Sequence, residues 1–294
     1  MVEVGPRDGL QNEPKTLPAS VKAELIDRLA ASGLKSVEAG SFVAPKAVPQ
    51  LADTADVLAL IARRPEVRYP VLVPNMTGFK AAKAAGADDI AVFIAASETF
   101  SRRNINCSIA DSLERCAPVC AAALEGGIRV RGYISCVMGC PYEGDIEAGA
   151  VAALAERLLG LGCHEISLGD TIGVGTPGQA AALVDTVAGL VPRDRLAVHF
   201  HDTYGQALAN LLAVLDRGIE AIDSAVAGLG GCPFAAGRQG AAAGNVASED
   251  VLYMLNGLGI ETGVDFDLLA ETGRFIAGHL GRPPASKANL ARGE

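Results

Sequence analysis

The sequence predicts a closed (β/α)₈ TIM barrel, and three observations lead to this prediction. The chain has 294 residues, which is close to the roughly 250 residues typical of such a barrel. Short runs of β-forming residues alternate with Ala- and Leu-rich helical stretches, as they do in βα units around a parallel sheet. Eight such strand-like runs are present, enough to close the sheet. We expect one TIM-barrel catalytic domain over residues 1–294, with a two-layer α/β fold as the alternative.

The expected elements follow one another along the chain with short connections. Strands are expected at residues 2–4, 36–39, 69–73, 90–95, 130–136, 165–168, 196–201 and 221–225. Helices are expected at residues 20–31, 54–63, 77–85, 109–124, 146–159, 179–190 and 206–217. A loop rich in Gly and Ala, residues 228–244, then leads to helical pieces at 249–255 and 266–280. Residues from about 258 to 294 therefore form a short C-terminal helical extension, with a mobile tail at 283–294.

Composition and charge exclude several classes of function. The formal net charge of −9 argues against binding to nucleic acid or to an anionic membrane, because both would repel the protein. No apolar run approaches the ~18 residues that a membrane span requires, and no basic flank or cleavable apolar segment opens the chain. The seven cysteines are an odd number without a CxxC pair, which indicates reduced thiols. We expect a cytoplasmic protein without nucleic-acid or membrane partners.

Polar side chains gather where the expected strands end. In a barrel of parallel strands these ends share one mouth, where active sites lie. The residues concerned are Arg7, Asp8, Glu38, Ser41, Asn75, Asp170, Thr171, His199, His201 and Asp202. The sequence therefore predicts an active site at the mouth of the barrel.

The pattern His199-Phe200-His201 predicts a metal site. Alternate residues of a strand point to the same side, so both imidazoles face the barrel interior. Asp8, at the end of the first strand, is the natural anionic ligand. Such a set suits a divalent ion, Mg²⁺ or Mn²⁺, that also accepts an oxygen-bearing substrate. The alternatives are two structural histidines and, for Arg7-Asp8, a surface turn.

Two glycine-rich segments need separate interpretation. Residues 173–178 match GxGxxG, follow a strand and open a helix, so a dinucleotide site is an alternative. Pro177 more simply begins a helix, and we expect these glycines to let the loop after Asp170 pass close to a bound ligand. Cys232 lies in the second segment, where an accessible thiol could exchange a proton beside the site. A loop cysteine without a role is the alternative.

Several motifs together resemble the hydroxymethylglutaryl-CoA lyase family. They are residues 5–13 (GPRDGLQNE), 38–43 (EAGSFV), 97–101 (SETFS), 139–142 (GCPY), 168–173 (LGDTIG), 199–203 (HFHDT) and 228–233 (GLGGCP). The match runs essentially end to end. The wider superfamily of barrel metallolyases and Claisen-type synthases shares the metal residues but not the Cys232 loop. The resemblance implies cleavage of 3-hydroxy-3-methylglutaryl-CoA to acetyl-CoA and acetoacetate, with a synthase or aldolase of that superfamily as the rival.

The resemblance also implies roles for individual residues. Its metal ligands are Asp8, His199, His201 and Asn245. Arg7 stabilises the enolate formed from the thioester, Cys232 protonates that enolate, and Glu38 and Asp170 lie near the reacting oxygens. His199 and Asp170 both remain candidates for removing the hydroxyl proton. The segment between Cys232 and Asn245 is longer than the family pattern.

The resemblance places four further residues along the acyl-CoA channel: Gln11, Ser41, Asn104 and Thr171. Hydrogen bonding within loops is the alternative for each. The partner it implies is the acyl-CoA substrate, and it implies a homodimer. Leucine breakdown, ketone body formation and another pathway using the same acyl-CoA remain open.

Overall fold

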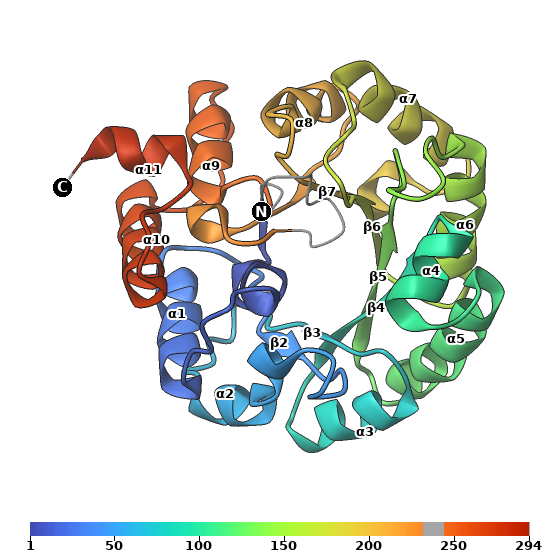
Figure 1. The fold of residues 1–294 in the computed structure, drawn as a ribbon, viewed down its shortest axis with the longest axis horizontal. Helices are drawn as coiled ribbons and strands as arrows, with labels where there is room; N and C mark the ends of the chain where they lie inside the picture. Colours follow the sequence, from blue (N-terminus) through green and yellow to red (C-terminus); the bar gives the residue numbers. More distant parts are fainter. Residues whose placement is uncertain (232–243, 294) are drawn as a thin grey trace.

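The computed structural model describes residues 1–231 and 244–293 and has the predicted barrel: eight parallel strands ringed by helices (Figure 1). The strand order is β1-β8-β7-β6-β5-β4-β3-β2. The strands are β1 Val2–Glu3, β2 Gly40–Ser41, β3 Val71–Leu72, β4 Asp89–Ala95, β5 Arg129–Ser135, β6 Glu165–Asp170, β7 Leu196–Phe200 and β8 Ala221–Ser224. The prediction of a (β/α)₈ TIM barrel is confirmed.

The barrel closes through the segment that precedes β2. The backbone N–H of Glu3 donates to Ser36 O at 2.9 Å, and the N–H of Glu38 donates to Glu3 O at 2.8 Å. The expected strand at residues 36–39 forms only bridges, at Glu3↔Val37 and Ser36↔Arg68, and regular pairing begins at Gly40. Pro70, opposite this segment, accepts from Ala39 N but has no N–H to return, so the ladder is interrupted there.

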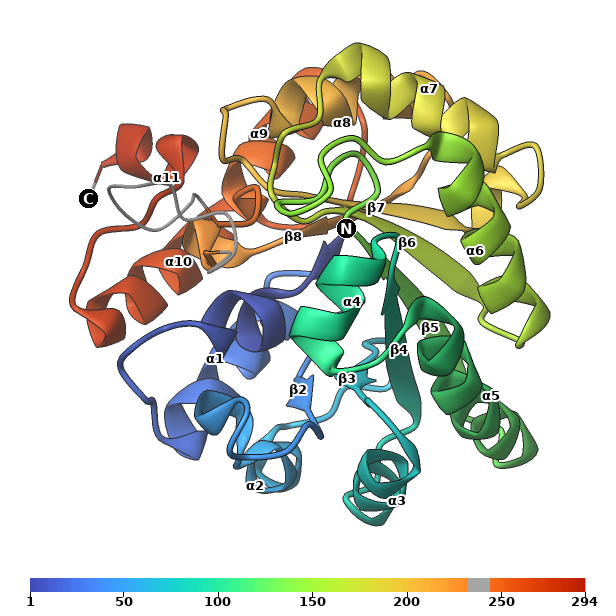
Figure 2. The ribbon, with the colours of Figure 1, turned by 45° about the vertical axis from the view of Figure 1, so that its right-hand side comes forward.

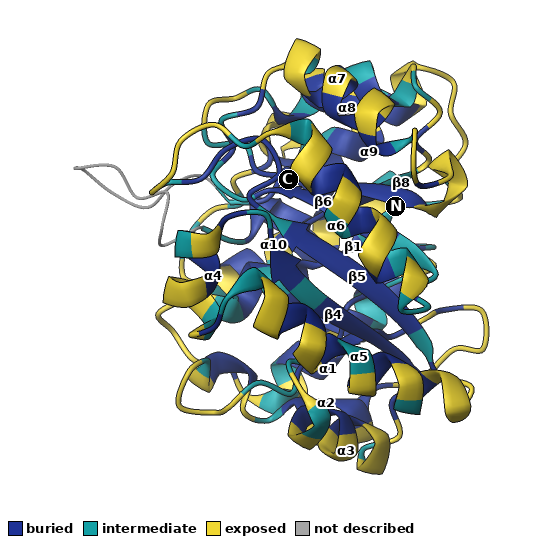
Figure 3. Cartoon of the chain, turned by 90° about the vertical axis from the view of Figure 1, so that its right-hand side faces the viewer, coloured by how far each residue is buried: buried dark blue, intermediate teal, exposed yellow. Residues whose placement is uncertain are grey.

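Helices cover the outside of the barrel, and their inner faces are buried while their outer faces are exposed (Figure 3). They are α1 Ala19–Ala31, α2 Thr54–Leu60, α3 Met76–Ala84, α4 Glu98–Ile105, α5 Ile109–Glu125, α6 Ala148–Gly160, α7 Pro177–Val187, α8 Ala207–Leu215, α9 Ser248–Gly257, α10 Phe266–Leu280 and α11 Lys287–Arg292. Short turns are η1 Gly5–Gly9, η2 Pro49–Leu51, η3 Arg193–Arg195 and η4 Val226–Gly228. None of the helices in the described part of the chain is long and apolar enough to cross a membrane.

Helix α4 lies beside β4 and was not expected from the sequence (Figure 2). Its N-cap is Ser97, whose Oγ accepts from Phe100 N at 3.1 Å. Phe100 and Ser101 are its only buried residues. The segment therefore lacks the apolar period by which a helix is predicted, and a local cap determines where it begins.

The expectation of a mobile tail at residues 283–294 was wrong over most of its length. Helix α11 lies against α9 and α10 (Figure 1). Ser286 caps it by accepting from Asn289 N at 3.0 Å and donates to Asp250 Oδ1 at 2.7 Å. Ser286 and Asn289 are both buried. These polar contacts are invisible to a reading based on apolar periodicity.

Candidate metal centre and active site

Asp8 is carried to the barrel mouth by the tight turn η1. The carbonyl of Val4 accepts from three consecutive amides, those of Arg7 at 3.2 Å, Asp8 at 2.8 Å and Gly9 at 3.1 Å. A Cβ on Gly9 would lie 2.7 Å from Leu229 Cβ. Any side chain at this position would push the turn away from the segment that follows β8.

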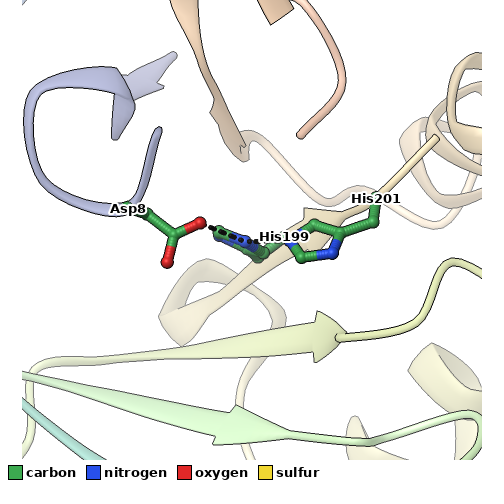
Figure 4. A group of neighbouring side chains, drawn as sticks. All are labelled: Asp8, His199 and His201. Atoms are coloured by element: carbon green, nitrogen blue, oxygen red, sulfur yellow. Dashed lines mark hydrogen bonds and ion pairs between the residues drawn. The ribbon is translucent and has the colours of Figure 1, made fainter. Parts of the chain in front are cut away.

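His199 and His201 lie at the end of β7 and face Asp8 (Figure 4). The candidate ligand atoms of these three residues all lie within 4.8 Å of one another, so they could hold a metal ion. The two Nε2 atoms are 3.2 Å apart, and His199 Nε2 is 3.7 Å from Asp8 Oδ2. The structure thus brings together the three residues that the strand pattern selected.

The second nitrogen of His199 faces a buried carboxylate. Its Nδ1 lies 3.2 Å from Asp223 Oδ2, which favours a proton on Nδ1 and leaves the Nε2 lone pair directed at the cluster. Burial lowers the pKa of His201 to about 4, followed in effect by the neighbouring His199. His201 is therefore neutral near neutral pH, and neutral imidazole is the form that binds metals. Two imidazole lone pairs and a carboxylate converging in a buried place fit a divalent cation.

The carboxylate of Asp8 remains ionised despite its environment. Burial acts to raise its pKa, but the charge of Arg7, followed by those of His199 and His201, lowers the pKa below its ordinary value. Arg7 Nη1 donates to Asp8 Oδ1 at 2.6 Å. Burial also opposes ionisation of Asp223, yet Arg131 and His199 lower its pKa to about 2. Both carboxylates therefore keep the negative charge that a cation requires.

Arg7 joins the candidate ligands to Glu38. Its Nε donates to Glu38 Oε2 at 2.8 Å, and its guanidinium lies 5.3 Å from the centre of the Tyr133 ring. Tyr133 in turn donates its hydroxyl to Glu38 Oε2 at 3.3 Å. Burial raises the pKa of Glu38, and the charge of Arg7 acts against this rise. Its other oxygen, Oε1, is buried without a hydrogen-bond partner among residues 1–231 and 244–293, so Glu38 can still accept a proton or a hydrogen bond from a ligand.

Three residues of this network were missed by the sequence analysis: Arg131, Tyr133 and Asp223. Arg131 donates to both oxygens of Asp223, at 3.0 and 2.7 Å, and to the hydroxyl of Tyr133 at 2.8 Å. A charged residue inside each of two apolar strand runs was the available signal. This signal does not predict that Arg131 and Asp223 contact each other, because the two residues are 92 positions apart in the sequence.

Asp170 ends β6 and is held by the glycine loop that follows it. Its Oδ2 accepts from Gly175 N at 2.8 Å and its Oδ1 from Val174 N at 3.2 Å. A Cβ on Gly173 would lie 2.7 Å from Thr203 Oγ1 and 2.8 Å from His201 O. The sequence predicted that these glycines let the loop pass close to a bound ligand. In the structure, Gly173 passes close to Thr203 and to the backbone of His201. Burial raises the pKa of Asp170, although these backbone amides oppose the rise.

Asn245 lies directly beside His201. The two residues form an isolated antiparallel bridge, flanked by bonds from Asp202 N to Gly244 O at 3.1 Å and from Val246 N to Phe200 O at 3.1 Å. The Asn245 amide donates to Asp8 Oδ2 at 2.9 Å. This residue therefore sits next to the cluster even though the segment before it is long, and its role as a ligand stays a prediction.

The remaining candidates are less uniform. Ser41 is buried and its Oγ accepts from Val43 N at 3.2 Å, while Thr171 Oγ1 accepts from Cys136 N at 2.8 Å. Both hydroxyls therefore make hydrogen bonds within loops, which was the alternative in the sequence analysis to a place along the acyl-CoA channel. Gln11 is partly exposed and Asn104 is exposed on α4. Cys232 lies outside the described residues.

Comparisons with known proteins agree on one family. A model of the HMGL-like family matches residues 1–276. A curated "3-hydroxy-3-isohexenylglutaryl-CoA/hydroxy-methylglutaryl-CoA lyase" from Pseudomonas aeruginosa is 58% identical and matches 99% of this chain and 96% of its own. The mitochondrial hydroxymethylglutaryl-CoA lyase of Arabidopsis thaliana is 57% identical over 99% of this chain, which spans 61% of that longer relative.

Solved structures give the same result. The crystal structure of hydroxymethylglutaryl-CoA lyase from Pseudomonas aeruginosa superposes with a TM-score of 0.96 at 58% identity, covering 99% of this chain and 96% of that one. An HMG-CoA lyase from Acinetobacter baumannii, whose structure holds coenzyme A and 3-methylmalate, has a TM-score of 0.93 at 38% identity over 99% of this chain and 93% of that one. The similarity therefore extends over the barrel and the helices that follow it.

Proposed function

Because this chain belongs to the HMGL-like family, we propose that it is a metal-dependent carbon–carbon lyase that cleaves 3-hydroxy-3-methylglutaryl-CoA to acetyl-CoA and acetoacetate. The observation that carries the proposal is the cluster of Asp8, His199 and His201 beside Arg7. The chain is also 58% identical to a relative named "3-hydroxy-3-isohexenylglutaryl-CoA/hydroxy-methylglutaryl-CoA lyase". The acyl-CoA is the proposed partner, and a solved relative holds coenzyme A.

The proposed reaction sets clear demands on the site. The C3 hydroxyl loses its proton, the C2–C3 bond breaks, and its electron pair enters the thioester as an enolate while C3 becomes the ketone of acetoacetate. Protonation of the enolate carbon then gives acetyl-CoA. The site must therefore accept one proton, stabilise negative charge at the thioester oxygen and return one proton.

The proposed metal ligands are Asp8, His199, His201 and Asn245. A divalent cation bound there, Mg²⁺ or Mn²⁺, supplies positive charge that favours loss of the hydroxyl proton and orients the substrate oxygens. The chain's own contribution is to hold Asp8 ionised and to direct the His199 Nε2 lone pair inward.

Arg7 is the proposed stabiliser of the enolate. Its bonds to Glu38 and Asp8 use Nε and Nη1, and Nη2 takes part in neither. These bonds fix the guanidinium at the mouth before substrate arrives, and preorganised charge of this kind is worth several kcal/mol in a water-poor site. Glu38 holds Arg7 in place and lies near the reacting oxygens.

Asp170 is the better of the two candidate bases. Both nitrogens of His199 are already directed, Nδ1 at Asp223 and Nε2 at the cluster. Asp170 ends β6, the strand that pairs with β7, and it lies close enough to His199 for the charge of that residue to act on its pKa. Burial raises the pKa of Asp170, which makes its carboxylate a stronger base than an exposed one.

Cys232 is the proposed donor of the final proton. The described residue before it, Gly231, accepts a hydrogen bond from Asn12 Nδ2 at 2.8 Å, and Asn12 belongs to the same motif as Arg7 and Asp8. This bond places Gly231, the last described residue before Cys232, beside that motif. Gln11, Ser41, Asn104 and Thr171 stay candidates for the acyl-CoA channel.

Three wider statements also belong to the proposal. One catalytic domain over residues 1–294 is supported by relatives that match 99% of the chain. The cytoplasmic location and the homodimer expected in the sequence analysis are also part of the proposal. Breakdown of leucine and formation of ketone bodies are the proposed settings, because both would use the same acyl-CoA.

A direct assay tests the function. Purified protein is incubated with 3-hydroxy-3-methylglutaryl-CoA and Mg²⁺ or Mn²⁺, and acetoacetate and acetyl-CoA are measured; equal amounts of the two are expected. Dialysis against EDTA should abolish product and added metal should restore it. Activity on acetyl-CoA plus a 2-oxo acid, with no acetoacetate formed, would instead support a synthase. Activity that survives complete metal removal would overturn the metal-dependent mechanism.

A further inference from the structure

The turn η4, directly after β8, contains a strained residue. Ala227 has φ 58° and ψ 13°, a left-handed conformation that is unfavourable for a residue with a Cβ. Such a conformation persists only where its surroundings hold it. Both backbone polar groups of Ala227 are held by residues outside the barrel strands: Glu249 of α9 and Ala285, in the connection between α10 and α11.

The Ala227 amide donates to both oxygens of Glu249, at 3.0 and 2.9 Å. The Ala227 carbonyl accepts from Ala285 N at 2.8 Å. Glu249 is fully buried on α9, and its Oε1 accepts from Asn289 Nδ2 of α11 at 2.9 Å. The segment around α11 therefore reaches the strained residue by two separate routes.

The contact between Asn289 and Glu249 is closely fitted. Asn289 is 3% exposed and also donates to Ala270 O at 2.9 Å. A Cβ on Gly273, in the middle of α10, would lie 2.2 Å from Glu249 Oε1 and 2.6 Å from Asn289 Nδ2. Glycine within a helix is less favourable than alanine. Helix α10 has its glycine at the position where the Glu249 carboxylate and the Asn289 amide lie against it.

The turn connects directly to the candidate metal centre. Leu229, two residues after Ala227, accepts from Asn245 Nδ2 at 3.2 Å, and the same amide donates to Asp8 Oδ2 at 2.9 Å. Leu229 also meets the turn that carries Asp8, because a Cβ on Gly9 would lie 2.7 Å from Leu229 Cβ. The position of η4 therefore determines where the Asn245 amide and the Asp8 turn can lie.

We propose that Asn289 is a positioning residue for the metal centre, acting through Glu249 and the strained turn at Ala227 on Asn245 and Asp8. This inference rests on the proposed function only in taking that centre as a metal site. Asn289 lies on α11, outside the barrel, so it touches neither a metal ion nor a substrate. Its effect is to hold the turn in the one conformation that places the ligands.

Metal affinity without substrate is the direct readout. Mn²⁺ binding to the full chain is measured by calorimetry and by electron paramagnetic resonance for the parent protein, for Asn289→Ala and for Leu290→Ala. Leu290 is 56% exposed on the same helix and is the matched control. Loss of a direct partner of a metal ligand costs roughly 10–100-fold in affinity. Because Asn289 is more distant, we expect Asn289→Ala to bind Mn²⁺ about three- to tenfold more weakly than the parent. The affinity of the Leu290→Ala control should equal that of the parent.

Activity and coupling give two further readouts. In Asn289→Ala at saturating metal, kcat should fall by a similar factor while KM changes less than about twofold. Glu249→Ala alone and the double variant complete a cycle; if Asn289 acts through Glu249, the double variant should bind Mn²⁺ no more weakly than Glu249→Ala. If Asn289→Ala does not fold, Asn289→Ser, which keeps a small polar side chain, takes its place.

The outcomes separate this inference from the proposed function. A parent protein that does not bind Mn²⁺ would overturn the metal centre and this inference with it. A parent that binds Mn²⁺, together with an Asn289→Ala variant of lower melting temperature but unchanged Mn²⁺ affinity, would show that Asn289 serves stability alone. Independent, additive effects of Asn289→Ala and Glu249→Ala would overturn the route through Glu249.

Discussion

The Oδ2 atom of Asp223 lies 3.2 Å from Nδ1 of His199 and also accepts from Ser167 Oγ at 2.9 Å and from Arg131 Nη1 at 3.0 Å. One carboxylate on β8 thereby orients a candidate metal ligand on β7 and balances a buried guanidinium. Because Arg131 balances the charge of Asp223, the carboxylate accepts a hydrogen bond from Nδ1–H while the proton stays on His199. The partner of a ligand is often as important as the ligand.

Replacing Asp223 tests that relationship. In Asp223→Asn the side-chain volume is kept, but the negative charge is lost and the amide can face His199 with its NH₂ group, which favours the wrong tautomer. We expect Mn²⁺ affinity, measured by calorimetry, to fall by about 10–100-fold. Asp89→Asn is the control, because Asp89 is also buried in a barrel strand but pairs with Arg68 at 3.6 Å. Equal affinities in Asp223→Asn and the parent would refute the orienting role.

A second prediction concerns pH and Glu3. Burial raises the pKa of Glu3 from 4.5 to about 8, while bonds from Ser248 and from the amides of Val226 and Gly5 oppose the rise. Between these two values the folded chain holds a proton that the unfolded chain has released. The stability contributed by Glu3 is thus present at low pH and is lost as the pH rises toward 8.

The variant Glu3→Gln isolates this contribution, since its amide cannot ionise. Urea unfolding at about pH 5.5 and about pH 8 should show that the parent loses more free energy of unfolding than the variant, by on the order of 1 kcal/mol or more. EDTA is present in both so that metal binding does not enter. A variant that loses as much stability as the parent between these pH values would mean that Glu3 is ionised in the folded protein throughout.

The core of the candidate site could be predicted because it depends on local rules. Strand alternation places His199 and His201 on one side wherever the strand lies, and closure of a parallel barrel brings Asp8 to the same mouth. The contacts that support these ligands could not be predicted in this way. Arg131 meets Asp223 across the barrel interior, and such a pairing depends on register between strands far apart in sequence.

The same distinction explains the errors in the fold. Eight strands were counted correctly because apolar β-rich runs mark them, but the second strand begins later than expected since Pro70 interrupts its ladder. Helix α11 was taken for a mobile tail because the last residues of a domain are often poorly ordered. It is held by polar contacts of Ser286 and Asn289, whose partners lie on α9 and become neighbours only in the folded chain.

Cys232 provides a third prediction. If its thiol returns the proton to the enolate, Cys232→Ala should lower kcat by roughly 10²–10⁴-fold, the range for general acid–base catalysis. Mn²⁺ affinity should be unchanged, because none of the proposed ligands is altered. Cys163→Ala is the control, since Cys163 is a buried cysteine at the other end of the barrel, before β6. Both quantities are measured on the same preparations, and an unaltered kcat in Cys232→Ala would leave the cysteine without a catalytic role.

Arg7 allows charge to be separated from geometry. Lysine keeps the positive charge, but its single ammonium group cannot reproduce the fork that bonds Glu38 through Nε and Asp8 through Nη1. If Arg7 stabilises the enolate by fixed geometry, Arg7→Lys should lower kcat by about 10²–10³-fold, as loss of one preorganised donor does. Mn²⁺ affinity should change much less, because a positive charge still lies beside Asp8. The exposed substitution Arg28→Lys on α1, where Arg28 pairs with Glu24, controls for the exchange itself. A large loss of Mn²⁺ binding with kcat preserved at saturating metal would instead place Arg7 among the residues that hold the metal ligands and remove it from the chemical step.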